Sequence, residues 1–545
     1  MPRPGRSATH AAQAPVIALI LGVLLVGLYD SGLARSRYPY VADSASYIEM
    51  ATSLRADGRP RVTPWDIESG DADAVPQPLF PPGFAVLIAT LVPLAGDVRT
   101  AALIPSRVAA ALLPFLLVVM WRDAAPRGVL LCLGLWVLLS PGVREWQFVA
   151  YSDVTGLALA VIALGALARP FAAGDPARAS RGWWLAGGLA AGLCYAVRNA
   201  GLAVLAASAA LLLYARLRSF IATRPLGLWA LGAALPLAAL AAYNLATFGT
   251  LQPYDMPASY RDWTANVVDY ATAQLEDLGL PLAASAALPG AAFVALLGLL
   301  IAVGLAAWWR TREDPPRHVV LTLLGLYAVA GGVLLVASRS RYEWGNNIDR
   351  RNVLQYSFAL ALALLTAARG ALPARAQRLG AIVLLAALAA SAAGAAREAL
   401  AAYRGAPEPW LALSRDASAM RAARELPATA LVASNAAPLF RIAAPRAVRQ
   451  LDLGSDDNDF ADALARLRMA AGPRPAAFLL VCDEWTAGLS ACRPGAARAG
   501  PACTRIRAAD PVVARCASAG VGRGEGARGL QPAAVGGPQT APAAS

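Results

Sequence analysis

Long, nearly uncharged apolar runs recur along this chain of 545 residues and constrain its fold more than any other feature. A helix needs about 20 such residues to cross a bilayer. The chain is 57% hydrophobic and 15% charged, whereas soluble proteins carry roughly a quarter charged residues. Because the runs are continuous rather than alternating, they exclude a transmembrane β-barrel. We therefore expect a polytopic α-helical membrane protein with about eleven transmembrane helices, at residues 15–33, 101–121, 128–141, 151–168, 183–196, 200–215, 226–247, 288–309, 318–337, 353–369 and 379–399.

Two segments depart from simple spanning helices. The apolar run 84–95 is too short to cross, and Asp97 and Arg99 follow it, so it predicts an interfacial or re-entrant helix. Residues 183–215 hold two short runs on either side of Arg198, which predicts a pair of short helices with a polar apex. Broken helices at membrane depth are tolerated where they line a cavity.

The basic residues indicate the topology. The chain contains no Lys, so all 48 basic residues are Arg. They concentrate in alternate short loops, and the positive-inside rule places those loops and the N-terminus in the cytoplasm. Everything after about residue 400 then lies outside. The net charge of +13 does not indicate nucleic-acid binding, because the Arg residues fall mostly between spans.

We expect three regions along the chain. Residues 1–399 form a transmembrane domain whose outer loop, 34–82, is long and acidic. Residues 400–516 predict a small extracytoplasmic α/β domain, with short buried strands at 431–435 and 477–481 and a helix at 456–470. Residues 517–545 are rich in Gly, Pro and Ala, which is typical of a disordered tail.

Cysteine and histidine usage limits the chemistry of the outer face. Four Cys residues lie in the outer domain, where they can form two disulfides in any of three connectivities. They are Cys482, Cys492, Cys503 and Cys516. The only two His residues, His10 and His318, lie near predicted cytoplasmic ends. A His-based catalytic or metal site on the outer face is therefore not expected.

Asp43 is the first candidate for chemistry, because it lies at the outer mouth of the first span. It shares a helical face with Tyr47, four residues later. Tyr47, Met50, Ala51 and Leu54 form an apolar stripe that can lie on the bilayer. Asp43 can serve either as a catalytic carboxylate or as a helix cap, and the residues alone leave both roles open.

An Arg-rich segment at 338–352 is the second candidate. It is predicted to be an outer loop, so its Arg residues run against the trend of the other loops. They are Arg339, Arg341, Arg350 and Arg351. Arg forks match phosphate oxygens and stay charged, although the loop can also be simply solvated near anionic lipid. Arg198 is a third candidate, with snorkelling to the headgroups as the alternative.

Two further acidic residues flank the outer end of the span at 151–168. Glu145 and Asp153 can orient an acceptor or hold a divalent cation, while an ion pair with Arg144 is the alternative. Four aromatic residues can stack on sugar rings or form part of an interfacial belt. They are Trp65, Tyr254, Tyr260 and Trp263.

The first outer loop resembles that of the bacterial GT-C membrane glycosyltransferases, namely the protein O-mannosyltransferase-like and aminoarabinose-transferase-like enzymes. The resemblance is carried by Asp43-x-x-x-Tyr47, Ala51-x-x-Leu54-x-x-x-Gly58 and Pro81-Pro82-Gly83-Phe84. Further matching features are Gly188-x-x-x-Gly192-x-x-x-x-x-Arg198 and Val432-Ala-Ser-Asn435. Many members carry a second acid after the first Asp, whereas this chain has Ser44.

The resemblance implies a GT-C fold and transfer of a sugar, with inversion, from a polyprenyl-phosphate donor. The acceptor would be a glycan, a lipid or a protein at the outer face of the bacterial cytoplasmic membrane. Asp43 would act as the general base. Substrate binding would involve Tyr47, Arg198, Arg339, Arg341, Arg350, Arg351, Glu145 and Asp153. No metal ligand is assigned and no cofactor is implied beyond a possible divalent cation.

Two other functions stay open. A transporter or flippase for a lipid or solute should often show interrupted helices at matching positions in two halves. This chain shows one broken pair and no second one after residue 288, which favours the enzyme. A relative of the GT-C enzymes that binds lipid without turnover is the other alternative.

Overall fold

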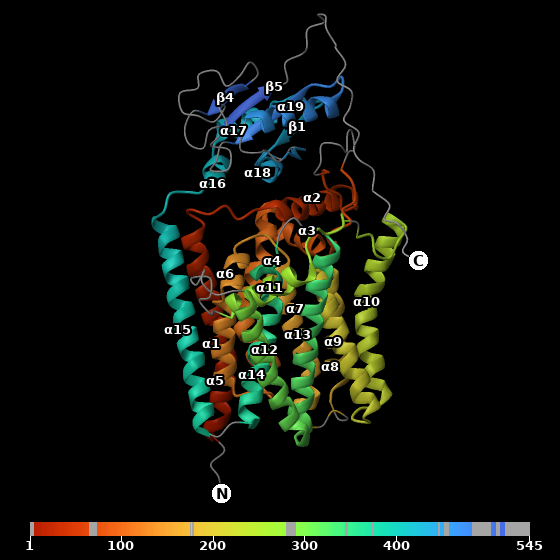
Figure 1. Cartoon of the computed structure of the whole chain (residues 1–545), viewed down its shortest axis with the longest axis vertical. Helices are drawn as coiled ribbons and strands as arrows, with labels where there is room; N and C mark the ends of the chain where they lie inside the picture. The colour runs from red at the N-terminus through yellow and green to blue at the C-terminus, as the bar shows by residue number, and fades with distance from the viewer. Residues whose placement is uncertain are drawn as a thin grey trace, which may run out of the picture.

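Most of the chain forms a bundle of helices, with a small sheet unit beyond one of its ends (Figure 1). The computed structural model describes residues 5–64, 74–174, 176, 179–254, 256–278, 290–343, 347–371, 374–444, 447–451, 457–481, 503–507 and 513–517. The bundle consists of α1 (Gly5–Leu33), α2 (Ala42–Asp57), α3 (Gly83–Ala95), α4 (Val98–Met120), α5 (Arg127–Leu138), α6 (Pro141–Gln147), α7 (Asp153–Ala172), α8 (Arg181–Val197), η1 (Asn199–Gly201), α9 (Leu202–Leu217), α10 (Thr223–Phe248), α11 (Trp263–Asp277), α12 (Gly290–Arg310), η3 (Thr311–Glu313), α13 (Pro315–Arg341), α14 (Arg350–Ala371) and α15 (Ala374–Arg404).

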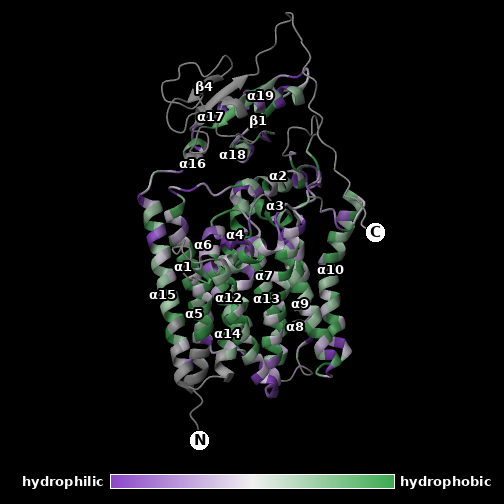
Figure 2. Ribbon diagram, in the orientation of Figure 1, coloured by the Kyte–Doolittle hydropathy of each residue, from purple (hydrophilic) through white to green (hydrophobic). Residues whose placement is uncertain are grey.

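Within the described residues, eight helices are long and apolar enough to cross a membrane. The number rises to nine if α5 and α6, which meet at 59°, form one broken span. The predicted count of eleven is not confirmed, because α8 and α14 occupy two predicted spans without belonging to this set. Hydrophobic residues dominate the helices between the two polar ends of the bundle (Figure 2). The chain is a multi-pass membrane protein.

Small residues bring neighbouring helices into close contact. A β-carbon added to Gly188 of α8 would lie 2.0 Å from the carbonyl oxygen of Trp229 on α10. One added to Gly192 would lie 2.7 Å from the carbonyl oxygen of Ala233. The Gly188-x-x-x-Gly192 motif therefore acts in helix packing, as small residues spaced by four commonly do in membranes.

The two unusual segments have the predicted form. The run at 84–95 is the 13-residue helix α3, which packs against α2 and α4 at one end of the bundle. The segment 183–215 is the helix pair α8 and α9, which a 3₁₀ turn joins. Arg198 stands at the break with an extended backbone, φ −153° and ψ 133°.

The sheet unit follows α15. It contains α16 (Pro409–Ser414), α17 (Ala417–Arg424), β1 (Leu431–Ser434), α18 (Ala437–Ala443), β2 (Arg449–Gln450), α19 (Asp457–Ala471), β3 (Ala476–Val481), β4 (Cys503–Arg507) and β5 (Val513–Ala517). The strand order is β2-β1-β3-β5-β4. The first three strands are parallel, and β5 is antiparallel to both β3 and β4. The predicted strands at 431–435 and 477–481 and the predicted helix at 456–470 are confirmed.

Several predictions for the C-terminal region stay open. Cys503 and Cys516 are register partners across β4 and β5, while Cys482 and Cys492 lie outside the described residues. The predicted pairing of these cysteines is therefore untested. The tail predicted from 517 lies almost entirely outside the described residues, and the domain boundaries at 399 and 516 remain predictions.

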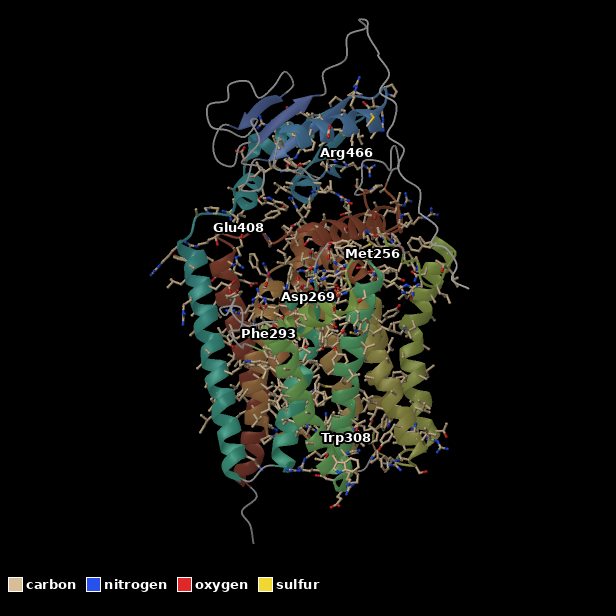
Figure 3. All side chains as sticks on the ribbon, in the orientation of Figure 1. Met256, Asp269, Phe293, Trp308, Glu408 and Arg466 are labelled. Carbon is tan, nitrogen blue, oxygen red and sulfur yellow. The ribbon has the colours of Figure 1, made fainter. Side chains whose placement is uncertain are left out.

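The sheet unit lies beyond the bundle end that carries α2 and α3, and the N-terminus lies at the opposite end (Figure 1). Figure 3 places Met256 near the first of these ends and Trp308 near the other. Glu408 lies between the bundle and the sheet unit in the same view. The backbone N–H of Glu408 donates to the carbonyl oxygen of Ser36 at 2.7 Å, which links the sheet unit to the segment 34–82.

Candidate active site

Asp43 lies in the first turn of α2, where a carboxylate interacts favourably with the helix dipole. It does not cap the helix. The N-cap is Val41, whose backbone N–H donates to the hydroxyl of Ser44 at 3.1 Å. Asp43 instead accepts a hydrogen bond from Arg351 across the site. The helix-cap interpretation is therefore wrong, and the carboxylate of Asp43 is directed toward an arginine 308 residues away.

Four charged side chains form an alternating chain at this end of the bundle. Arg351 Nη2 lies 2.5 Å from Asp43 Oδ2. The Nε atom of the same guanidinium lies 3.3 Å from Asp153 Oδ1. Asp153 Oδ2 in turn lies 2.6 Å from Nη1 of Arg198. We call these four side chains, Asp43, Arg351, Asp153 and Arg198, the charge quartet.

Asp153 joins the two arginines of the quartet. It is the first residue of α7, and its side chain is fully buried. A buried carboxylate requires close positive partners, and Asp153 has two. It does not line the cavity described next, so it holds Arg198 and Arg351 in place rather than facing a substrate. This differs from the predicted role for Asp153, in which it orients an acceptor directly.

A cavity of about 450 Å³ opens beside the other three members of the quartet. Its walls come from the start of α2, the segment 77–81, the break between α8 and α9, the segment 252–256, the end of α13 and the start of α14. Its polar lining residues are Asp43, Ser46, Tyr47, Gln77, Tyr195, Arg198, Asn199, Gln252, Tyr254, Ser338, Tyr342, Asn347, Asp349, Arg351, Asn352 and Tyr356. Most are hydroxyl or amide side chains, which suit a ligand rich in hydroxyl groups.

Tyr47 lies in the cavity wall and is buried. Its hydroxyl is 3.0 Å from the hydroxyl of Ser152, and its ring contacts Phe80 and Phe84. Burial raises the pKa of Tyr47, so the phenol stays neutral and is not the base. The predicted bilayer-facing stripe is wrong, because Tyr47, Met50 and Ala51 pack inside the protein. An apolar stripe indicates burial without specifying lipid or protein as the partner.

The Pro-Pro-Gly element contacts the Arg198 apex directly. A β-carbon on Gly83 would lie 2.4 Å from the carbonyl oxygen of Ala196, near the end of α8. Asn199 Nδ2 donates to the carbonyl oxygen of Leu79 at 3.0 Å. Only a residue without a side chain permits the close approach of position 83 to Ala196. Two motifs that are more than a hundred residues apart in the sequence therefore build one wall of the cavity.

Three of the four Arg residues of the segment 338–352 do not line the cavity. Both ends of the segment expected to be a loop are helical, because α13 continues to Arg341 and α14 begins at Arg350. Arg339 is only 1% exposed and forms an ion pair with Glu343 at 3.0 Å. Arg341 is exposed and lies over the ring of Tyr342. Arg350 faces Glu145 at 3.7 Å.

The two predicted acidic residues, Glu145 and Asp153, also lie outside the cavity wall. Glu145 is half exposed beside Arg350 and does not line the cavity. The alternative ion pair with Arg144 is wrong, since Arg144 pairs with Glu398 at 3.3 Å. In the part of the chain that the structure describes, no three His, Cys, Asp or Glu side chains lie close enough to hold a metal ion. Glu145 and Asp153 both face arginines, so they do not fit the divalent cation considered from the sequence.

The sequence reasoning missed several cavity residues. Asp349 lies in the Arg-rich segment and caps α14, where its Oδ1 accepts from the backbone N–H of Asn352 at 3.3 Å. Tyr195 precedes the Arg198 apex, and Gln77 precedes the Pro-Pro-Gly element. Each lies within a few residues of a motif, and that proximity is the signal that could have identified them.

Of the aromatic residues considered for sugar stacking, only one is placed at the cavity among the described residues. Tyr254 lines it and contacts Tyr342 with ring centroids 5.2 Å apart. Tyr260 and Trp263 are 82% and 50% exposed, as expected for interfacial residues. Trp65 lies outside the described residues.

Comparison with known proteins supports the fold. No family model matches the sequence, and no curated protein does. ArnT from Cupriavidus metallidurans bound to undecaprenyl phosphate aligns with a TM-score of 0.54 and 13% identity, over 92% of this chain and 97% of that one. The apo oligosaccharyltransferase of Archaeoglobus fulgidus aligns with a TM-score of 0.56 and 13% identity, over 88% of this chain and 70% of that one. The archaeal oligosaccharyltransferase AglB from Archaeoglobus fulgidus, in complex with an inhibitory peptide and a dolichol-phosphate, aligns with a TM-score of 0.51 and 12% identity, over 86% of this chain and 69% of that one. The chain has the GT-C fold, as the motifs predicted.

Proposed function

We propose that this chain is a membrane glycosyltransferase that moves a sugar from a polyprenyl-phosphate donor to a cell-envelope acceptor. One observation carries the proposal: Asp43, Arg198 and Arg351 meet at the wall of a single cavity. A carboxylate can take a proton from an acceptor, and guanidiniums can hold a phosphate. The GT-C fold supports the same reaction class, because both kinds of neighbour are named as transferases or occur with a polyprenyl phosphate.

The proposed reaction is a single in-line displacement. The acceptor oxygen forms a bond to the anomeric carbon while the bond from that carbon to the donor phosphate breaks. The electron pair of the broken bond stays on the phosphate oxygen, and Asp43 accepts the proton of the acceptor hydroxyl. One displacement inverts the configuration at the anomeric carbon.

The arginines suit the charge that develops on the leaving group. A phosphate monoester carries about −1.5 to −2 charges near neutral pH, and two guanidiniums can balance it. Arg198 and Arg351 keep their charge when buried, unlike Lys. Nε of Arg198 is buried and has no hydrogen-bond partner among the described residues, so the protein does not use all the donors of this guanidinium.

The cavity dimensions suit the polar head of such a donor. A volume of about 450 Å³ is at the small end of the range of about 300–1,000 Å³ for ligand pockets. Its amide and tyrosine lining can donate to and accept from sugar hydroxyls. The polyprenyl chain would stay among the apolar helices.

We place the cavity at the outer face of the bacterial cytoplasmic membrane. The Arg-rich short loops, such as those at 122–127 and 216–224, connect helix ends at the side of the N-terminus (Figure 1). By the positive-inside rule this side is cytoplasmic. The cavity and the sheet unit lie at the opposite end of the bundle.

The test has two parts, which are a binding measurement on the full chain in nanodiscs and complementation of a deletion strain with two matched variants. Wild-type protein should bind undecaprenyl phosphate, and a deletion strain should lose one surface glycan by mass spectrometry. Asp43→Asn should not restore that glycan, whereas Asp57→Asn, on the exposed end of the same helix, should restore it. Restoration by Asp43→Asn would contradict the base assignment. Lipid movement in proteoliposomes without any glycan change would instead favour a flippase.

A further inference from the structure

The guanidinium of Arg351 is shared between two carboxylates of different character. Asp153 is completely buried and has Arg198 as a second partner at 2.6 Å. The Asp43 side chain is 21% exposed and lines the cavity. Within the described residues, Arg351 is its only ion-pair partner. The candidate base therefore has its charge neutralised by one arginine at contact distance.

This pairing masks the base. Arg351 Nη2 donates to Asp43 Oδ2 at 2.5 Å, a charge-assisted hydrogen bond of the strong class. An acceptor hydroxyl that approaches Asp43 would compete with a full positive charge for the carboxylate. While this bond is intact, Asp43 is poorly placed to accept a proton.

The two contacts of Arg351 use different edges of its guanidinium. Nε faces the buried Asp153 at 3.3 Å from Oδ1 and 3.4 Å from Oδ2, while Nη2 faces Asp43. The guanidinium carbon lies 4.1 Å from the ring centroid of Tyr151 and 5.3 Å from that of Trp146. Asp153 and the two rings hold the group at the cavity wall. Nη2 can therefore change its partner without movement of the rest of the side chain.

A phosphate is the ligand chemistry that would take this partner position. Phosphate oxygens match the geometry of a guanidinium and carry a negative charge. Arg198 lies on the same wall and is tied to the same Asp153. A phosphate between Arg198 and Arg351 would accept from both and displace Asp43 from Nη2.

We propose that the donor phosphate unmasks the base by taking Arg351 Nη2 from Asp43, so that proton transfer to Asp43 occurs only in the donor complex. This inference rests on the proposed function and adds an order of binding to it, with the donor before the acceptor. The acceptor proton then moves to Asp43 as the sugar–phosphate bond breaks and its electron pair remains on the phosphate.

The experiment measures the affinity of the full chain for undecaprenyl phosphate in nanodiscs at constant ionic strength. Removing the Asp43 carboxylate should release Arg351 and tighten binding by about threefold to tenfold, the value of one charge-assisted hydrogen bond discounted for exposure. Asp43→Asn and Asp43→Ser both remove it, and Asp57→Asn is the matched control with unchanged affinity. Thermal unfolding of each variant confirms that it is folded.

The outcomes separate this inference from the proposed function. Tighter binding in the Asp43 variants, with no change in Asp57→Asn, supports the unmasking. Equal or weaker binding in a folded Asp43 variant overturns it and leaves the transferase proposal intact. Failure of the wild-type protein to bind undecaprenyl phosphate overturns both.

Discussion

Glu49 and Arg441 form a bidentate ion pair across 392 positions of the chain. Arg441 Nε lies 2.7 Å from Glu49 Oε1, and Nη2 lies 2.5 Å from Oε2. Arg441 is fully buried in α18, and its Nη2 also donates to the carbonyl oxygen of Thr63 at 2.6 Å. Glu49 belongs to the same helix as Asp43. The sheet unit therefore holds the helix that carries the candidate base.

Arg441→Met should destabilise the protein and slow sugar transfer. It leaves Glu49 without its buried partner, which costs about 3–5 kcal/mol for comparable pairs. Thermal unfolding in detergent measures the first effect and the transfer rate measures the second. Arg421→Met, at an exposed position on α17, should change neither. An unchanged transfer rate in a destabilised Arg441→Met protein would show that the pair does not position Asp43.

Gly83→Ala should weaken binding of undecaprenyl phosphate. The added methyl group would lie 2.4 Å from the carbonyl oxygen of Ala196, so α3 must move away from the Arg198 apex. Comparable overpacking costs about 1–3 kcal/mol of stability. Gly27→Ala on α1 is the control, since a β-carbon there meets nothing within 4 Å. Equal affinities in the two variants would show that the apex tolerates the shift.

Lys substitutions should distinguish the two cavity arginines from an arginine outside the cavity. Arg198→Lys and Arg351→Lys each lose the planar fork, and we expect at least about tenfold weaker binding of undecaprenyl phosphate. Arg341→Lys should bind as the wild-type protein does, because Arg341 lies outside the cavity wall. Titration at constant salt measures all three. Weaker binding of undecaprenyl phosphate in Arg341→Lys alone would indicate that the phosphate binds at the end of α13.

Tyr47→Phe should retain most of the activity and keep the pH profile of the wild-type protein. Burial raises the pKa of Tyr47 above its ordinary value near 10. Its phenol therefore does not ionise between about pH 6 and about pH 9. The variant loses only the hydrogen bond to Ser152, worth about 0.5–1.5 kcal/mol. Transfer rates across this pH range provide the measurement. Complete loss of activity would assign the phenol a direct chemical role.

Local features of the sequence predicted much of the architecture. The apolar runs predicted the membrane helices, and the short length of 84–95 predicted the short α3. The polar break at Arg198 predicted the helix pair, because an Arg between two apolar runs is costly unless it lies at an apex. Asp43, Tyr47, Arg198 and Arg351 were all singled out, and the structure places all four at the cavity.

Errors arose where the answer depended on partners distant in the sequence. Hydropathy falls before Arg339, but the helix continues to Arg341, so the start of a segment interpreted as a loop is the end of α13. The ion pair between Asp43 and Arg351 spans 308 positions, and nothing local indicates it. Arg339 has the same charge as Arg351 but is paired with Glu343. One sequence does not show which of several arginines is already neutralised.

The contacts of the sheet unit join parts of the chain that are synthesised far apart in time. Ser36, Glu49 and Pro64 in the segment 34–82 bond to Glu408, Arg441 and Arg449, which are synthesised several hundred residues later. Domains fold in the order of synthesis, so the early helices insert while α2 still lacks these partners. The helix that carries Asp43 therefore gains these contacts only after the sheet unit has been synthesised.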